Sequence, residues 1–198
     1  MFEHIGEVIR ANVFANIPWI TRAAGLTDPA TTTDGGAVRV FPAARAYDGA
    51  PCDAGEFYVN MSPQEGETAI AFVQDYSPIK VVNERGRWRQ LEAAFSVVVW
   101  YDERRILVNA DSIMFAMQSA IITGVLAANY DTDGLHGVKA RFSSITTDPA
   151  RVWQRYDVYN VQRGLLLRPY RTFEVEFGLK AQFDPACFTS EITAQEPC

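Results

Sequence analysis

The densest group of side chains that could bind another molecule lies in residues 83–90, NERGRWRQ. It holds three arginines and a tryptophan: Arg85, Arg87, Trp88 and Arg89. Guanidinium groups bind phosphates and carboxylates, and an indole stacks on a base or fills a pocket of a partner protein. Arginines are also common on exposed turns that bind nothing. Because the rest of the chain is acidic, we expect this segment to dock on a protein surface.

A pair of carboxylates, Glu174 and Glu176, lies in a segment where apolar residues take every second position. On an extended strand both side chains point to the same side, as in the carboxylate pairs that hydrolyse glycosidic bonds. Acidic residues that alternate on an exposed strand more commonly face water or basic neighbours. We therefore predict that Glu174 and Glu176 are exposed and contact the basic segment of a neighbouring copy, and we expect no catalytic residue.

Other candidate sites have little support. The two histidines, His4 and His136, are too few for a histidine metal site and have no serine and aspartate arranged around them as a triad. The chain contains three dispersed cysteines, which suit free thiols. Residues 129–134, NYDTDG, begin like a calcium loop, but Ala140 stands where the closing glutamate belongs. We interpret this segment as the turn after a helix and expect no metal and no cofactor.

Composition predicts one globular domain. The chain has 198 residues, of which 48% are hydrophobic and 21% charged, and this suits a single domain over residues 1–185 with a flexible tail at 186–198. The net charge of −6 argues against a dedicated nucleic-acid binder but permits a local basic patch. We expect any contact with DNA to be local and weak. The start, MFEHIGEVIR, lacks the pattern of a signal peptide, so we expect assembly in the cytosol.

Periodicity predicts the elements that position these groups. Apolar residues at three- and four-residue steps predict two helices, one from residue 2 to a stop at Pro18 and one over residues 112–128. Residues 26–36 are rich in turn formers and predict a loop. Alternating apolar residues predict strands over residues 37–41, 57–61, 68–76, 77–84, 91–103, 138–145 and 170–183. The predicted fold is α+β, a mostly antiparallel sheet with two helices packed on one face and a long C-terminal strand.

The last strand is unusually long. Its 14 residues, YRTFEVEFGLKAQF, span about 46 Å at about 3.3 Å each, whereas strands commonly have 5 or 6 residues. We expect it to extend past its sheet or to run along a partner.

The order of these elements resembles the tail terminator, or tail completion, proteins of long-tailed bacteriophages. The likeness covers residues 1–183 and is carried by the alternation at 173–183, the helix at 112–128 and the hairpin before it. The family has a small α+β fold that forms a hexameric ring, caps the tail tube and joins it to the head-completion proteins. The resemblance implies a structural virion protein of the tail or neck, assembled in the bacterial host cytoplasm, and no enzyme.

The resemblance also implies partners. These are other copies of the chain in a homohexamer ring, the tail tube protein, a head-completion or connector protein and a sheath protein, while DNA only passes through the lumen and no membrane is involved. Two alternatives stay open. One is another head-to-tail connector or tube component. The other is a cytosolic α+β module that binds a small ligand, in a pocket lined by Trp100, Trp153, Tyr156 and Tyr159.

Overall fold

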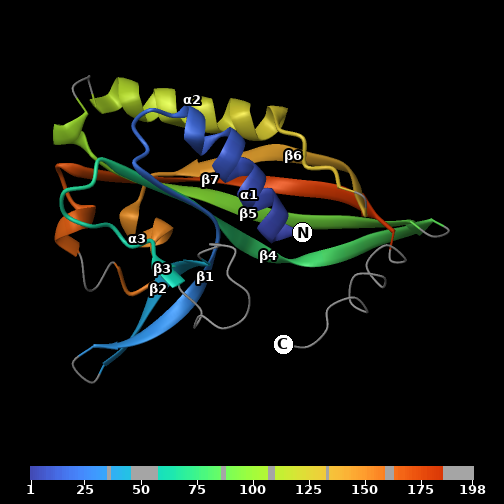
Figure 1. The fold of residues 1–198 in the computed structure, drawn as a ribbon, viewed down its shortest axis with the longest axis horizontal. Coiled ribbons are helices and arrows are strands. Elements are labelled where there is room, and N and C mark those ends of the chain that lie inside the picture. The colour runs from blue at the N-terminus through green and yellow to red at the C-terminus, as the bar shows by residue number, and fades with distance from the viewer. Residues whose placement is uncertain are drawn as a thin grey trace.

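The computed structural model describes residues 1–34, 37–45, 58–85, 88–106, 110–132, 134–158 and 163–184. These residues form a seven-stranded sheet of strand order β3-β2-β1-β4-β5-β7-β6, with helices packed against it (Figure 1). The strands are β1 Arg22–Asp34, β2 Ala37–Arg45, β3 Tyr58–Asn60, β4 Ala69–Arg85, β5 Trp88–Asp102, β6 Leu135–Thr146 and β7 Tyr170–Phe183. Neighbouring strands are antiparallel except β1 and β4, which are parallel. The predicted mixture of helices with a mostly antiparallel sheet is confirmed.

The helices are α1 Phe2–Asn12, α2 Ala110–Ala127 and α3 Pro149–Val152, with short 3-10 turns at η1 Phe14–Asn16, η2 Glu103–Arg105 and η3 Arg163–Leu166. α1 ends before the predicted stop at Pro18, because the chain tightens into η1 after Asn12. α3 begins at Pro149, and the side chain of Asp148 accepts a hydrogen bond from the amide of Ala150. None of the described helices is long and apolar enough to cross a membrane.

The two longest-paired strands, β5 and β7, lie inside the sheet. They pair without a bulge from Arg89 and Phe183 at one end to Asp102 and Tyr170 at the other, and β6 pairs with the other side of β7. The expectation that the last strand extends past its sheet is therefore wrong. β5 occupies one edge of β7 along its whole length, and β6 occupies the other from Glu174 to Phe183.

Regular pairing sorts the side chains of β5 and β7 onto two faces. One face, which we call the first face, carries Phe95, Val97 and Val99. These side chains lie in a core, the first core, that also contains residues of α1 and α2. The second face carries Val98 and Trp100. These side chains lie in a second core together with residues of the segment that follows β6, which contains α3 and which we call the α3 segment. That segment contributes three fully or almost fully buried side chains: Val152, Trp153 and Tyr156.

Two predictions about the strands are wrong. Residues 26–34 belong to β1 rather than to a loop, because they pair with β2 and, at Leu26 and Thr27, with β4, and β-branched threonines suit a strand. The last two residues of the predicted loop, 35 and 36, lie outside the described residues. Residues 68–76 and 77–84, predicted as separate strands, join in β4. Pro78 interrupts the pattern there, and three register shifts against β5 accommodate it.

Candidate interface on the long hairpin

The predicted basic segment lies at the end of the β4–β5 hairpin. Trp88 and Arg89 open β5, and Arg85 closes β4 opposite Trp88. Arg87 lies outside the described residues. Next to the tip, the register lines up four polar residues across four strands, with Gln90 paired to Asn83 and Gln182, and Gln182 paired to His136.

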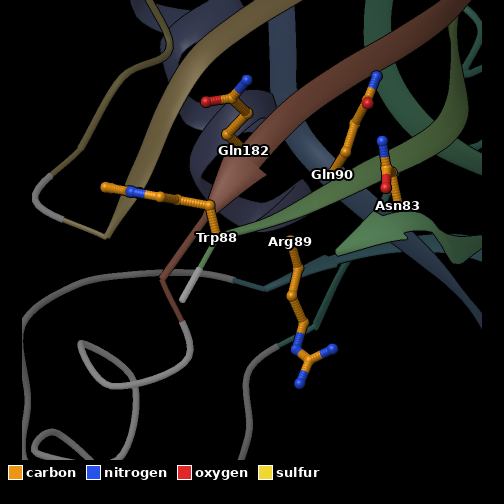
Figure 2. Close-up of a pocket in the computed structure, with 5 residues that line it drawn as sticks. All are labelled: Asn83, Trp88, Arg89, Gln90 and Gln182. Carbon is orange, nitrogen blue, oxygen red and sulfur yellow. The ribbon is translucent and has the colours of Figure 1, made fainter. Parts of the chain in front are cut away.

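These residues border an open pocket with a volume of about 320 Å³, lined by Asn83, Trp88, Arg89, Gln90 and Gln182 (Figure 2). Figure 2 shows the three amide side chains extending to one side of the strands and Arg89 extending to the other. Amides donate and accept hydrogen bonds without carrying charge. The pocket therefore suits a neutral polar group of a partner.

Trp88 of β5 is half-buried, and its ring reaches past the end of β7 to His136 of β6. The edge of one ring meets the face of the other between Trp88 and His136, with ring centroids 5.4 Å apart and planes inclined by 76°. Such pairs contribute about 0.5–1.5 kcal/mol beyond their buried area. Trp88 is therefore held in place on the sheet, so it offers a partner a fixed surface.

Glu174, in contrast, is buried, and the prediction that it faces water or a neighbour is wrong. Its side chain is 3% exposed, and its Oε1 accepts a hydrogen bond from Gln74 Nε2 at 2.8 Å. The Tyr156 hydroxyl donates to Gln74 Oε1 at 2.9 Å, so Gln74 links the α3 segment to β7. Burial raises the pKa of the Glu174 carboxyl. Burial also raises the pKa of Tyr156 to about 12, which keeps it a neutral donor.

Glu176 is also more enclosed than predicted. Its Oε2 accepts a hydrogen bond from Ser144 Oγ at 2.7 Å, and the guanidinium of Arg151 lies 3.9 Å from its Oε1. The alternation of β7 correctly places both glutamates on one face, but the α3 segment covers that part of the face. Glu174 is nine residues along β7 from Phe183, the partner of Arg89, which is about 30 Å. One chain does not bring the glutamates and the hairpin tip together.

A strip of exposed apolar side chains runs along β4 toward the tip. It consists of Tyr76, Ile79, Val81 and Val82, which are 43–51% exposed. β1 leaves β4 after Gln74, and the described residues provide no other strand on that side. We call these four residues the β4 strip. The sequence feature that could have revealed the β4 strip is the pair of successive apolar residues Val81 and Val82. A half-buried strand would alternate apolar and polar residues at these positions.

The backbone of this edge is poorly suited to pairing with another strand. Pro78 has no amide hydrogen, Lys80 adds an exposed charge and three register shifts bend the strand. These are features by which proteins prevent sheets from joining edge to edge. The β4 strip is therefore suited to contacts through side chains rather than to an extension of the sheet.

The pocket predicted under the helices is filled. Trp100 and Trp153 are 0% exposed and Tyr156 is 4% exposed, all within the second core. Trp100 stacks on Tyr170, and Trp153 and Tyr156 both contact the ring of Phe72. Tyr159 lies outside the described residues. The side chains of Trp100, Trp153 and Tyr156 hold the α3 segment on the sheet.

The described residues contain no group of three or more histidine, cysteine, aspartate or glutamate side chains placed to hold a metal ion. Searches against protein-family models and against curated proteins found no match to this chain. The most distinctive surface that the described residues offer for function is thus the β4–β5 hairpin, which carries the β4 strip and the pocket at Trp88.

Proposed function

We propose that this chain is a structural, self-assembling subunit of the tail terminator type, which forms a ring that caps a tail tube and joins it to head-completion proteins. The observation that carries the proposal is the β4 strip, an apolar surface that a single chain leaves in contact with water. Exposed apolar groups beside polar ones are typical of protein interfaces. The proposal includes the packing of α1 and α2 on one face, supported by their shared core with β5 and β7.

A ring requires a head-to-tail contact, in which one surface of a subunit binds a different surface of the next. In the proposed contact, the β4 strip supplies the apolar centre, and Trp88 with the amides of the pocket supplies the polar rim. Each copy carries a net charge of −6, so copies repel one another at low ionic strength. Added salt screens this repulsion, and we expect it to favour assembly.

We expect the substitution Ile79→Lys to shift the protein from ring to monomer while changing the free energy of unfolding by less than about 0.5 kcal/mol, as for other exposed positions. The physical reason is that a charge at the centre of an apolar contact must be desolvated. Light scattering after size exclusion, with negative-stain images of the main peak, measures the mass and shape. Val38→Lys is the matched control, because Val38 is an exposed valine on β2, 68% exposed and outside the strip.

Two outcomes of this experiment contradict the proposal. One is a wild-type chain that is monomeric at every concentration and salt tested. The other is a loss of assembly in Val38→Lys as large as in Ile79→Lys, which would mean that added charge alone disrupts the ring.

Trp88→Ala tests the rim of the same contact. We expect it to weaken self-association at least tenfold, because tryptophans that fill interface pockets contribute about 2 kcal/mol or more. The loss of the ring contact with His136 should lower the free energy of unfolding by about 1 kcal/mol. Concentration-dependent light scattering and urea unfolding measure the two effects. Normal assembly with a large loss of stability would place Trp88 in the folded core rather than in the interface.

A further inference from the structure

Exposed basic side chains collect on the second face of the sheet, on the half that the α3 segment does not cover. They are Lys80 of β4, Lys180 of β7, and Lys139 and Arg141 of β6, and we call them the basic half-sheet. The register places Lys80, Lys180 and Lys139 in one row across the sheet, with Glu92 of β5 between the first two. Arg141 pairs with Gly178 and lies one row further toward α3.

The register also fixes the face on which these side chains lie. Gly178 and Lys180 follow Glu174 and Glu176 at steps of two along β7, so they share the second face. Ala140, between the two basic residues of β6, pairs with Leu179 and belongs to the first core. Lys139 and Arg141 therefore point away from that core, to the second face.

The basic half-sheet is positively charged although the whole chain is negative. Within the described residues, Lys80, Lys139 and Arg141 form no salt bridge. Lys180 lies 2.6 Å from Glu92, and Arg151, whose side chain is 57% exposed, borders the patch 3.9 Å from Glu176. Five basic side chains thus meet two acidic ones that are at least partly exposed, an excess of three positive charges on a chain of net charge −6, while Glu174 of the same face is 3% exposed beneath the α3 segment.

The centre of the patch is open. A Cβ atom built on Gly178 would have no atom within 4 Å, and Gly178 lies beside Ala94 and Arg141. A glycine inside a strand lets another molecule approach the backbone closely. The surface between the cations is therefore low and accessible, so a ligand that spans several of them meets no obstruction.

We propose that the basic half-sheet binds the phosphate backbone of duplex DNA, weakly and without sequence preference. Neighbouring rows of one sheet face are about 6.8 Å apart and neighbouring strands about 4.8 Å apart, so the cations are spaced to meet several phosphates at once. Single strands are bound largely by stacking on aromatic rings. Trp88, which the register places on the same face four residues before Glu92, is already in contact with His136. Charge rather than stacking therefore determines the ligand.

This inference goes beyond the proposed function, because all residues of the patch belong to one chain and no ring is needed. On an acidic chain, a basic area also helps to orient the molecule on DNA, since acidic surfaces are repelled by phosphates. Contact through about three phosphates gives micromolar to submillimolar affinity at physiological salt. Such contact would hold DNA near the subunit without stopping its movement.

The test is fluorescence anisotropy of a labelled short duplex of random sequence, titrated with the full-length protein at several salt concentrations. We expect the logarithm of the binding constant to fall with the logarithm of salt concentration with a slope of about −3. The double variant Lys139→Glu with Arg141→Glu should weaken binding at least tenfold and bring the slope closer to zero by about 2. Lys139→Gln with Arg141→Gln should give the same reduction in slope with a smaller loss of affinity. This neutral variant keeps the inference testable if the charge-reversed variant does not fold.

The matched control is Arg10→Glu with Arg168→Glu, which makes the same change in net charge at two exposed residues outside the patch. It should bind the duplex within about threefold of wild type. Three results would overturn the inference: no binding by the wild-type chain at low salt, equal losses in the control and in the Lys139 and Arg141 variants, or tighter binding of a single strand than of the duplex. Light scattering in the same buffers measures self-association independently. A loss of DNA binding can therefore be distinguished from a loss of ring assembly.

Discussion

Replacing Gly6 with alanine is expected to lower the free energy of unfolding by about 2–3 kcal/mol, although alanine is the better helix former by about 1 kcal/mol. Gly6 lies in α1, where that helix crosses β1. An added Cβ would lie 2.4 Å from the backbone nitrogen of Leu26 and 2.9 Å from the carbonyl carbon of Gly25. Neither atom belongs to a side chain that can rotate away. The whole helix would have to shift from its place over the core.

The expected loss in the free energy of unfolding is large because buried residues anchor α1 in the core. Ile5 and Ile9 are 0% exposed and Val13 is 3% exposed, all in the core that β4, β5 and β7 share. Lifting the helix to accommodate one methyl group weakens these contacts together, since cores are packed at crystal-like density. The loss of packing therefore exceeds the gain in helix propensity.

Thermal unfolding followed by circular dichroism measures the effect, and a fall in melting temperature of about 5–10 °C is expected for a chain of this length. Gly178→Ala is the matched control, because its added Cβ meets nothing within 4 Å. That variant should unfold within about 2 °C of wild type or slightly higher. A rise in melting temperature for Gly6→Ala would mean that α1 and β1 are further apart than the structure places them.

Strong periodicity made several elements predictable. β7 begins and ends as predicted, and α2 and β5 differ from the predicted bounds by a few residues at most. In each of them the apolar pattern reports burial directly, because the side chains that repeat are those that enter the core. Composition also directed attention to the hairpin tip, where Trp88 and Arg89 border the pocket.

Other features depend on which elements pack together, and no local pattern records this. β1 is rich in turn formers and becomes a strand because it pairs with β4 near its start and with β2 along the rest of its length. The alternation of β7 puts Glu174 and Glu176 on one face, yet it cannot indicate that α3 covers that face. The amide row beside Trp88 is a product of register. Asn83, Gln90 and Gln182 are unremarkable one by one, and only the pairing of the strands brings them together.

The buried Glu174 predicts an unusual dependence of stability on pH, which Glu174→Gln should abolish. Burial raises its pKa, the adjacent Glu176 adds to the rise, and the hydrogen bond from Gln74 with the charge of Arg151 opposes it. A raised pKa in the folded state means that its contribution to stability is complete below the unfolded pKa, about 4.3, and is lost as pH rises through the folded pKa. Glutamine keeps an acceptor for Gln74 and never ionises. We therefore expect Glu174→Gln to gain stability relative to wild type as pH rises.

Asp102 provides the control of opposite sign. Its side chain is 1% exposed, and Arg104 donates to it through Nε at 2.9 Å and Nη2 at 2.8 Å. These bonds lower the pKa of Asp102, so its contribution is complete above the unfolded pKa of about 3.9 and is lost as pH falls through the folded pKa. Asp102→Asn should accordingly be destabilised at neutral pH and approach wild type in acid. Urea unfolding between about pH 2 and about pH 8 measures both variants. A constant difference between Glu174→Gln and wild type across this range would show that Glu174 has the same pKa in the folded and unfolded chains, and would contradict its burial beneath α3.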